Sequence, residues 1–289
     1  MSEMVLLGDE AVALAAVHAG LTAAYGYPGT PSTEILEYLI RYGRSHGGPR
    51  AEWCANEKTA YEAALGVSFA GRRTMVTMKH VGLNVAADPF MNSALVTVNG
   101  GLVVAVADDP GMHSSQNEQD SRVFADFARV VCLEPASHQE AYDMTREAFD
   151  VSERFHIPVM VRLVTRLAHS RGIVQIGEPR GENPPHKNLQ PSAWVLLPGN
   201  ARRQWKALLD RFDDIRAYVS ASRFNAVAGG EGGVGVITTG LARNYLMENL
   251  EDLQARPAHL HIGAYPYPVE TIRAFVAPLT RVLLLEEGY

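Results

Sequence analysis

Residues 74–107 read TMVTMKHVGLNVAADPFMNSALVTVNGGLVVAVA, in which two short apolar runs flank a longer segment. Thr74–Met78 and Leu102–Ala107 are apolar at almost every position, as strands are when helices cover both faces of a parallel sheet. The segment between them, Val81–Val98, has helical spacing and is long enough to connect two parallel strands. These residues therefore predict a strand–helix–strand unit of an α/β fold.

The same alternation extends in both directions along the chain. Apolar runs recur before and after this unit, and helix-period segments of ten or more residues separate most of them. We therefore expect an α/β fold with a three-layer, mostly parallel sheet over residues 1–175. The expected strands are 21–27, 51–54, 74–78, 102–107, 130–133 and 158–163, and the expected helices are 9–19, 32–42, 57–70, 81–98 and 139–155.

The composition changes after the last of these strands. Glu178–Pro191 contains four prolines among charged and amide residues, which is typical of a linker. A charged helix is expected at 201–217, so residues 176–230 are predicted to connect two units. Residues 231–289 then resume the alternation with three expected strands and two helices. Because so few elements rarely make an independent α/β domain, we expect the second unit to be incomplete.

Composition excludes several classes of protein. The 289 residues are 47% hydrophobic and 20% charged, which supports a buried core and excludes a disordered chain. The net charge is −6 with Lys and Arg scattered, so we expect no nucleic-acid partner. Cys54 and Cys132 lie far apart and cannot build a four-cysteine cluster. The apolar run Ala11–Ala24 follows two acidic residues and is too short to span a bilayer, so we expect a cytoplasmic protein without membrane segments.

Polar residues follow two of the expected strands, at the sheet edge where open α/β sheets bind ligands. Tyr25–Thr33 leads from strand to helix, with Thr30 as a candidate N-cap and Pro31 at the first helical position. Glu57 opens the next helix directly after Asn56, a favourable N-cap. Both features also have an ordinary explanation, because capping residues and acids in a first helical turn stabilise helices in any fold.

Two further strand ends carry polar groups. Lys79 is either a solvated cation or a ligand for an anionic group, while His80 is more typical of a structural hydrogen-bonding residue than of a catalyst. The loop 108–116 is long and polar, as binding loops are. Asp108 and Asp109 lack an identifiable third hard ligand. We therefore predict no metal site in this chain.

Two other patterns fail on their context. Gly230–Gly235 matches G-x-G-x-x-G, but it precedes an apolar strand, whereas a dinucleotide fingerprint follows a strand and opens a helix. A nicotinamide-dependent dehydrogenase is therefore a weak hypothesis. His259 and His261 share one face of an expected strand, but without a third ligand they are better interpreted as core or surface histidines.

Taken together, the motifs resemble the alpha subunits of indolepyruvate ferredoxin oxidoreductases, in the thiamine-diphosphate-dependent 2-oxoacid:ferredoxin oxidoreductase superfamily. The resemblance covers residues 1 to about 175 closely, while 234–289 more loosely resemble the start of a transketolase-C-terminal-like domain. The motifs are GYPGTPS at 26–32, NEK at 56–58, VTMKHVGLNVAADP at 76–89, VADDPGMHSSQNEQD at 106–120, EPAS at 134–137 and EAYDM at 140–144.

The resemblance implies a pyrimidine-type domain of the thiamine-diphosphate-binding fold over 1–175, followed at 231–289 by an incomplete transketolase-C-terminal-like domain. It assigns Glu57 as the catalytic carboxyl, which hydrogen-bonds the aminopyrimidine ring of the cofactor. Because Glu57 must share a proton with that ring, we expect apolar surroundings. The implied cofactor-binding residues are Tyr27, Pro28, Gly29, Thr30, Pro31, Lys79, Gly82 and Asn84, and the implied substrate-binding residues are Thr30, His113 and Ser114.

The implied activity is thiamine-dependent oxidative decarboxylation of an arylpyruvate-type 2-oxo acid to an acyl-CoA, with electrons passed to ferredoxin. The family carries a G-D-G motif followed by a magnesium-binding Asn, but here Gly8-Asp9 is followed by Glu10. We therefore expect half of a thiamine diphosphate site, with magnesium and [4Fe–4S] clusters supplied by a missing diphosphate-binding domain or a partner subunit in an oligomer. The alternative is a catalytically silent assembly or regulatory subunit.

Overall fold

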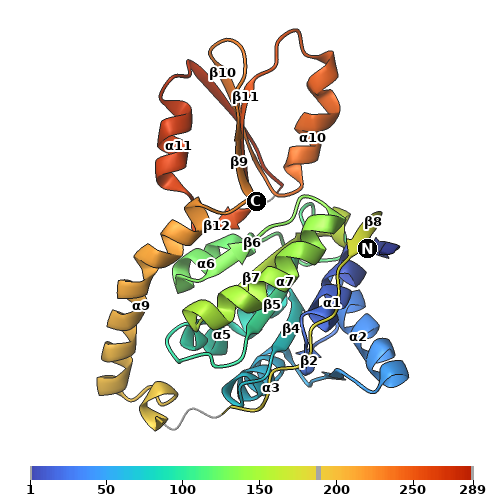
Figure 1. Ribbon diagram of the computed structural model, residues 1–289, viewed down its shortest axis with the longest axis vertical. Helices are drawn as coiled ribbons and strands as arrows, with labels where there is room; N and C mark the ends of the chain where they lie inside the picture. The colour runs from blue at the N-terminus through green and yellow to red at the C-terminus, as the bar shows by residue number, and fades with distance from the viewer. Residues whose placement is uncertain (1, 187–189, 288–289) are drawn as a thin grey trace.

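The computed structural model of the chain describes residues 2–186 and 190–287. It has a larger part built on a seven-stranded sheet and a smaller part built on a four-stranded sheet, shown below and above in Figure 1. The long helix α9 (Pro198–Ser220) runs along one side and connects the two. Positions 187–189 of the predicted linker lie outside the described residues, and the rest of 177–190 contains no helix or strand.

The larger sheet has the strand order β12-β6-β7-β5-β4-β2-β3. Six strands run parallel and only β12, at one edge, is antiparallel, which confirms the mostly parallel sheet. Every residue of β4, β5 and β7 is buried, as their apolar runs predicted. The strands are β2 (Ala23–Gly26), β3 (Arg50–Trp53), β4 (Thr74–Lys79), β5 (Leu102–Asp108), β6 (Val131–Leu133), β7 (Val159–Val164) and β12 (Ala264–Tyr265).

Helices form the outer layers. Because β3 and β4 lie on opposite sides of β2, right-handed crossovers place α2 (Thr33–His46) and α3 (Glu57–Phe69) on opposite faces of the sheet. Helix α1 (Gly8–His18) packs against both α2 and α7, and α5 packs against α3. The other helices of this part are α4 (His80–Val85), α5 (Ala87–Ser93), α6 (Ser121–Ala128), α7 (His138–Phe155), α8 (Thr165–His169) and the short η1 (Pro191–Ala193).

Two local predictions for this part were incomplete. The single helix expected at Val81–Val98 is two short helices, α4 and α5, and the helical run ends at Ser93. Pro89 has no amide hydrogen to continue the α4 ladder, which explains the break. An antiparallel pair formed by β1 (Ser2–Leu7) and β8 (Arg171–Ile176) was not predicted from the sequence.

The smaller part has the strand order β13-β10-β11-β9, with α10 and α11 on either side in Figure 1. Its sheet begins at residue 225, before the predicted boundary at 231, because β9 pairs antiparallel with β11. The division into 1–175, 176–230 and 231–289 stays a prediction. The elements are β9 (Asn225–Ala228), β10 (Val234–Thr239), α10 (Ala242–Asn249), η2 (Leu250–Asp252), β11 (Ala258–Ile262), α11 (Val269–Val276) and β13 (Arg281–Leu285).

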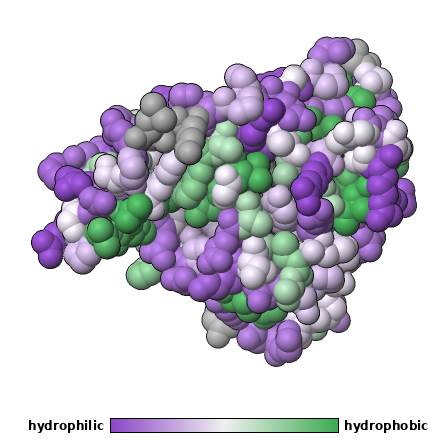
Figure 2. Space-filling view, turned by 90° about the horizontal axis from the view of Figure 1, so that it is seen from below, coloured by the Kyte–Doolittle hydropathy of each residue, from purple (hydrophilic) through white to green (hydrophobic). Residues whose placement is uncertain are grey.

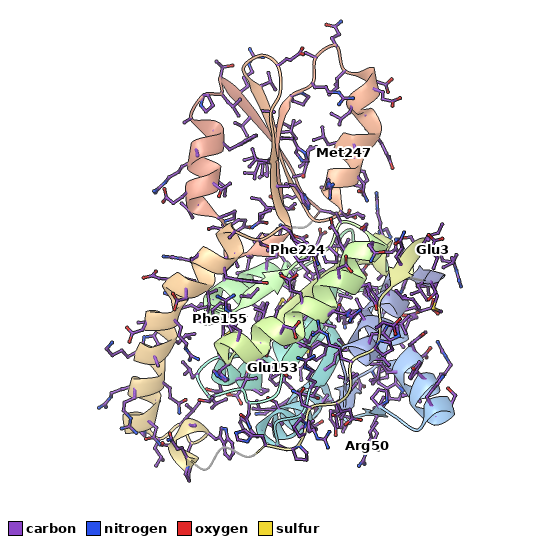
Figure 3. The ribbon with its side chains drawn as sticks, in the orientation of Figure 1. Glu3, Arg50, Glu153, Phe155, Phe224 and Met247 are labelled. Atoms are coloured by element: carbon purple, nitrogen blue, oxygen red, sulfur yellow. The ribbon has the colours of Figure 1, made fainter. Side chains whose placement is uncertain are left out.

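The two parts share backbone and side-chain contacts. Strand β12 belongs to the segment of the smaller part but pairs with β6 of the larger sheet. Phe224, which is 5% exposed, lies where the two parts meet (Figure 3). Across the junction, the Glu134 amide of the larger part donates a hydrogen bond to the Gly263 carbonyl at 2.7 Å. The smaller part is therefore anchored to the larger one near the carboxyl ends of its strands.

A set of charged side chains, here called the buried arginine network, lies at this junction. Arg162 on β7 has no exposed surface and forms ion pairs with Asp108, at 2.6 Å, and with Glu134. Arg122 on α6 pairs with Asp120 at 2.6 Å, and Arg122 also bonds the Thr239 hydroxyl of β10 at 3.1 Å. The network comprises Arg122, Arg162, Asp108, Asp120 and Glu134.

No helix within the described residues is both long and apolar enough to cross a bilayer. Seen from below, the apolar residues of the surface lie in several separate patches among polar ones (Figure 2).

Candidate functional site

Glu57 is the first residue of α3, and its side chain is only 8% exposed. Asn56 caps this helix, as predicted: its side-chain oxygen accepts a hydrogen bond from the Thr59 amide at 2.9 Å. The Thr59 hydroxyl in turn accepts one from the Asn56 amide at 3.3 Å. Because both bonds fix the first turn of α3, they also fix the direction in which Glu57 leaves the backbone.

Glu57 lies directly against Gly82 of α4. A methyl group added at Gly82 would lie 2.5 Å from Glu57 Oε1, so the space occupied by this carboxyl requires glycine there. Among the described residues, none donates a hydrogen bond to the Glu57 side chain. A covered carboxyl without a protein partner can share a proton with a ring nitrogen of a ligand. The aminopyrimidine of thiamine diphosphate has such a nitrogen, so the surroundings of Glu57 fit this cofactor.

The turn at 27–33 differs from the prediction. Thr30 is not the N-cap and Pro31 is not the first helical residue, because α2 begins at Thr33 behind Ser32. The Ser32 amide donates to the Gly29 carbonyl at 2.9 Å, which closes a separate turn before the helix starts. The Gly29 amide donates to the Thr33 hydroxyl, also at 2.9 Å. Tyr27, Pro28 and Thr30 consequently remain exposed.

Lys79, at the end of β4, connects this turn to the loop after β5. Its side chain is buried against Gly29, and its ammonium donates to the Ser114 carbonyl at 3.2 Å. The Ser114 hydroxyl donates to the Thr30 carbonyl at 3.3 Å. Burial lowers the pKa of Lys79, while the charge of Asp109 acts in the opposite direction. The structure thus brings Gly29, Thr30, Lys79 and Ser114 together.

Asp109 holds the 109–115 loop in place, a role that the sequence analysis did not assign. Its carboxylate accepts hydrogen bonds from the Ser114 amide at 2.8 Å and from the Thr165 hydroxyl at 2.7 Å. Burial alone raises the pKa of Asp109, but these hydrogen bonds outweigh it and bring the pKa down to about 2. Only the position of Asp109 at a strand end signalled such a role in the sequence.

The remaining predicted residues are less closely connected. His113 and Asn84 are exposed, and no hydrogen bond in the described part joins their side chains to Glu57 or Lys79. His80 Nε2 bonds the Asn117 carbonyl at 3.0 Å, in line with the structural role expected for it. Two buried atoms beside β4, Thr77 Oγ1 and His80 Nδ1, have no hydrogen-bond partner among the described residues.

The weaker sequence patterns have ordinary structural explanations. Gly230–Gly235 leads into β10 and opens no helix. The rings of His259 and His261 both bond the Thr238 hydroxyl, at 2.8 and 3.0 Å. Burial lowers the pKa of His261 to about 3, so this histidine is neutral at physiological pH. Asp108, considered above for metal binding, is instead paired with Arg162.

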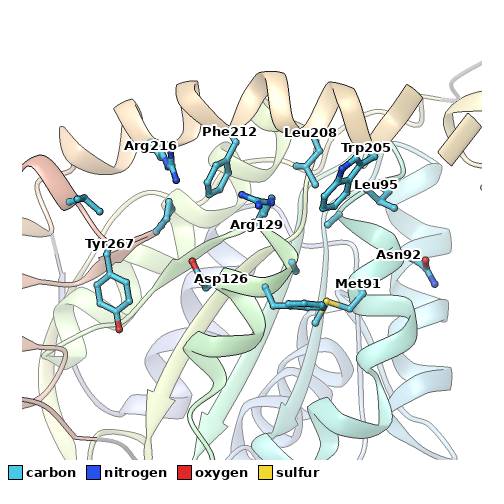
Figure 4. Close-up of a pocket in the computed structure, with 15 residues that line it drawn as sticks. Met91, Asn92, Leu95, Asp126, Arg129, Trp205, Leu208, Phe212, Arg216 and Tyr267 are labelled. Atoms are coloured by element: carbon cyan, nitrogen blue, oxygen red, sulfur yellow. The ribbon is translucent and has the colours of Figure 1, made fainter. Parts of the chain in front are cut away.

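A cavity of about 590 Å³ between α5, α6 and α9 is lined by none of the predicted site residues (Figure 4). The Arg129 guanidinium lies over the rings of Trp205 and Phe212, at 5.9 and 5.1 Å from their centroids. This cavity was not predictable from the sequence, because its walls come from segments that are far apart in the chain.

The family profile described as "Pyruvate flavodoxin/ferredoxin oxidoreductase, thiamine diP-bdg" matches residues 14–194, so the chain belongs to this family. The indolepyruvate oxidoreductase subunit IorA of Archaeoglobus fulgidus is 42% identical over 98% of this chain and 46% of its own length. The corresponding IorA subunit of Methanothermobacter thermautotrophicus is 39% identical over 99% of this chain and 47% of its own length. The chain spans about half the length of these curated relatives.

Solved structures show the same fold. A 2-oxoglutarate:ferredoxin oxidoreductase from Magnetococcus marinus superposes with a TM-score of 0.78 at 18% identity, covering 98% of this chain and 57% of that one. A split-gene transketolase superposes with a TM-score of 0.62 at 15% identity, covering 98% of this chain and 79% of that one. Both likenesses confirm the α/β architecture expected for a pyrimidine-type thiamine diphosphate domain.

Proposed function

We propose that this chain is the pyrimidine-binding part of a 2-oxoacid:ferredoxin oxidoreductase of the indolepyruvate type. The whole enzyme would oxidatively decarboxylate an arylpyruvate-type 2-oxo acid to an acyl-CoA and pass the electrons to ferredoxin. Family membership supports the cofactor class, and the names of the curated relatives support the substrate class. The observation that carries the proposal is Glu57, a covered carboxyl without a protein partner at the carboxyl edge of a parallel sheet.

In this proposal, Glu57 holds a proton at the ring nitrogen of the aminopyrimidine. The fixed N-cap at Asn56 keeps the carboxyl in one orientation, and Gly82 leaves it room. When bound, thiamine diphosphate supplies the nucleophilic carbon and the electron sink that decarboxylation needs. A positioned carboxyl that shares a proton with the ring accounts for a rate contribution of about 10²–10⁴-fold, typical of general acid–base catalysis.

The groups around Lys79 are proposed to face the substrate. A 2-oxo acid carries a carboxylate, and the buried Lys79 side chain provides a cation beside the turn that contains Gly29 and Thr30. Ser114 links the two and would position the loop against the substrate. The proposed contacts of Tyr27, Pro28, Gly29, Pro31, Asn84 and His113 with cofactor or substrate also belong to this hypothesis.

The rest of the active centre is proposed to come from elsewhere. Cys132 is buried and Cys54 half-buried, so the two cysteines offer no cluster for iron and sulfur. The sequence likewise lacks the G-D-G…Asn pattern that binds magnesium in the family. A diphosphate-binding domain with magnesium, the [4Fe–4S] clusters, and sites for coenzyme A and ferredoxin would therefore belong to partner chains or to further sequence of an oligomeric complex.

The test is a Glu57→Gln variant in the assembled complex, with Glu62→Gln as the matched control. Glu62 lies on the same helix but its side chain is 53% exposed. Hydrogen–deuterium exchange at the thiazolium carbon of bound cofactor should fall by about 10²-fold or more in Glu57→Gln and stay unchanged in Glu62→Gln. Unchanged exchange in Glu57→Gln would remove the role assigned to it. A complex that assembles normally but shows no exchange with the wild-type chain would favour the assembly-subunit alternative.

A further inference from the structure

Three helix ends meet on the side of α1 that faces α2 and α8. Asp9 lies in the first turn of α1, Glu34 in the first turn of α2, and His169 at the end of α8. One side-chain oxygen or nitrogen from each residue lies within 4.8 Å of the others. The prediction of no metal site rested on Asp108 and Asp109 and did not consider this group, whose three residues are far apart along the chain.

The backbone brings α1 and α8 into this contact. The Gly8 amide donates to the Ser170 carbonyl at 3.3 Å. A side chain at Gly8 would collide with the Leu167 carbonyl, so only glycine allows so close an approach. As a consequence, Asp9 and His169 face each other across the junction, and Glu34 joins them from α2.

Asp9 lacks the partners that a buried carboxyl needs. Its side chain has no exposed surface, and neither Oδ1 nor Oδ2 accepts a hydrogen bond from any described residue. Glu34 Oε2 is likewise buried without a hydrogen-bond donor. The neighbouring charges that act on Asp9, those of Glu34 and Glu10, are both negative. Burying carboxylates in this way is unfavourable unless a proton or a cation joins them.

We propose that Asp9, Glu34 and His169 bind a divalent first-row transition metal ion, with Zn²⁺ as the representative of that class. An imidazole nitrogen beside two carboxylate oxygens suits these ions, whereas Mg²⁺ and Ca²⁺ prefer oxygen ligands alone. Glu34 Oε2 lies 3.4 Å from His169 Nε2. Two ligands at about 2.1 Å from a tetrahedral Zn²⁺ are separated by roughly 3.4 Å, so this pair is already spaced for coordination.

The fourth position is open to water. The side chains of Glu34 and His169 are each 34% exposed, so an ion can enter from solvent while Asp9 forms the floor of the site. The ion would tie together the ends of α1, α2 and α8. Because α2 follows the Gly29–Ser32 turn directly, the bound ion would also restrain that turn.

The competing explanation is a proton shared between Asp9 and Glu34. Burial raises the pKa of Asp9 well above its usual value, and the negative charge of Glu34 adds to this. A protonated Asp9 would donate a hydrogen bond to Glu34, and an asparagine at position 9 would do the same. Asp9→Asn therefore separates the two explanations, because the amide can donate to Glu34 but is a poor metal ligand.

The experiment uses the tag-free 289-residue chain after treatment with a chelator. Zn²⁺ is titrated calorimetrically, and Co²⁺ is added separately because its visible spectrum reports the ligand field. Glu34→Gln and His169→Gln accompany Asp9→Asn, since His169 is half-exposed and its replacement spares the core. The matched control is Glu37→Gln, on the same helix, where the side chain is 48% exposed.

The proposal expects one Zn²⁺ per chain, with affinity reduced about tenfold or more by each of the three ligand substitutions and unchanged in Glu37→Gln. Zn²⁺ should also slow amide exchange in the first turns of α1 and α2. The proposal is overturned if Zn²⁺ fails to bind at millimolar concentration, or if Asp9→Asn binds it as tightly as the wild type. Neither result depends on thiamine diphosphate or on activity.

Discussion

Replacing Arg162 with methionine tests how much the buried arginine network contributes to the stability of the fold. Arg162 is fully buried and pairs with Asp108 and Glu134, which are themselves buried. Methionine fills a similar volume but leaves both carboxylates facing an apolar side chain. Because an unpaired buried charge is far less favourable than an ion pair, we expect a large loss of folding free energy.

The size of the loss follows from the partners that remain. Breaking a buried pair by removing one member costs about 3–5 kcal/mol. Asp108 keeps the Ser121 amide at 3.0 Å, and Glu134 keeps the Tyr265 hydroxyl at 2.5 Å. These bonds place the expected loss near the lower limit, at about 3 kcal/mol. For a domain of this size, that corresponds to a melting temperature lower by roughly 6–12 °C.

Urea unfolding followed by far-UV circular dichroism and tryptophan fluorescence measures this loss. Arg166→Met is the matched control, because Arg166 is 62% exposed and its pair with Glu287 is worth less than about 1 kcal/mol. Adding Glu134→Gln to Arg162→Met should recover part of the stability, since it removes the charge of one of the two carboxylates that lost Arg162. The reasoning is refuted if Arg162→Met and Arg166→Met unfold at the same urea concentration.

Two further predictions concern the candidate site. Gly82→Ala should abolish most thiamine-dependent activity of the assembled complex, because the new methyl group displaces the Glu57 carboxyl. The chain should still fold, because the Glu57 side chain can move aside and the helix propensity of alanine offsets part of the packing cost. Full activity in this variant would contradict the proposed packing. The pKa of Asp109 is about 2 in the folded state, below its ordinary value of 3.8. The ionised carboxylate therefore adds to the unfolding free energy in full above pH 3.8, and this stabilisation is lost as the pH falls through the folded pKa. Between pH 4 and pH 2, the wild type should therefore lose about 2 kcal/mol more unfolding free energy than Asp109→Asn, as measured by urea titration at each pH. Equal losses would show that the Ser114 and Thr165 hydrogen bonds do not stabilise the charge.

The larger sheet was predictable because its central strands are fully covered. A strand buried on both faces must be apolar at nearly every position, so β4 and β5 are recognisable without any partner. The cap of α3 was predictable for a similar reason, since Asn56 acts on an amide three residues away. Structural features that depend on a few consecutive residues can therefore be predicted from a single sequence.

Features that depend on distant residues were not predictable. β12 has two residues, too few for a periodic pattern, and it is a strand only because β6 lies beside it. The start of α2 was misplaced because Ser32 and Thr33 close a turn with Gly29, a choice that capping preferences alone do not decide. The cluster of Asp9, Glu34 and His169 exists only after three helices have packed.

Strand β12 has a practical consequence for dissecting this chain. Without Ala264 and Tyr265, the outer side of β6 would present unpaired backbone N–H and C=O groups. Open strand borders of this kind recruit strands from other molecules, which leads to self-association. A fragment that ends before residue 264 is therefore expected to self-associate, whereas one that retains Ala264 and Tyr265 keeps the outer edge of β6 paired.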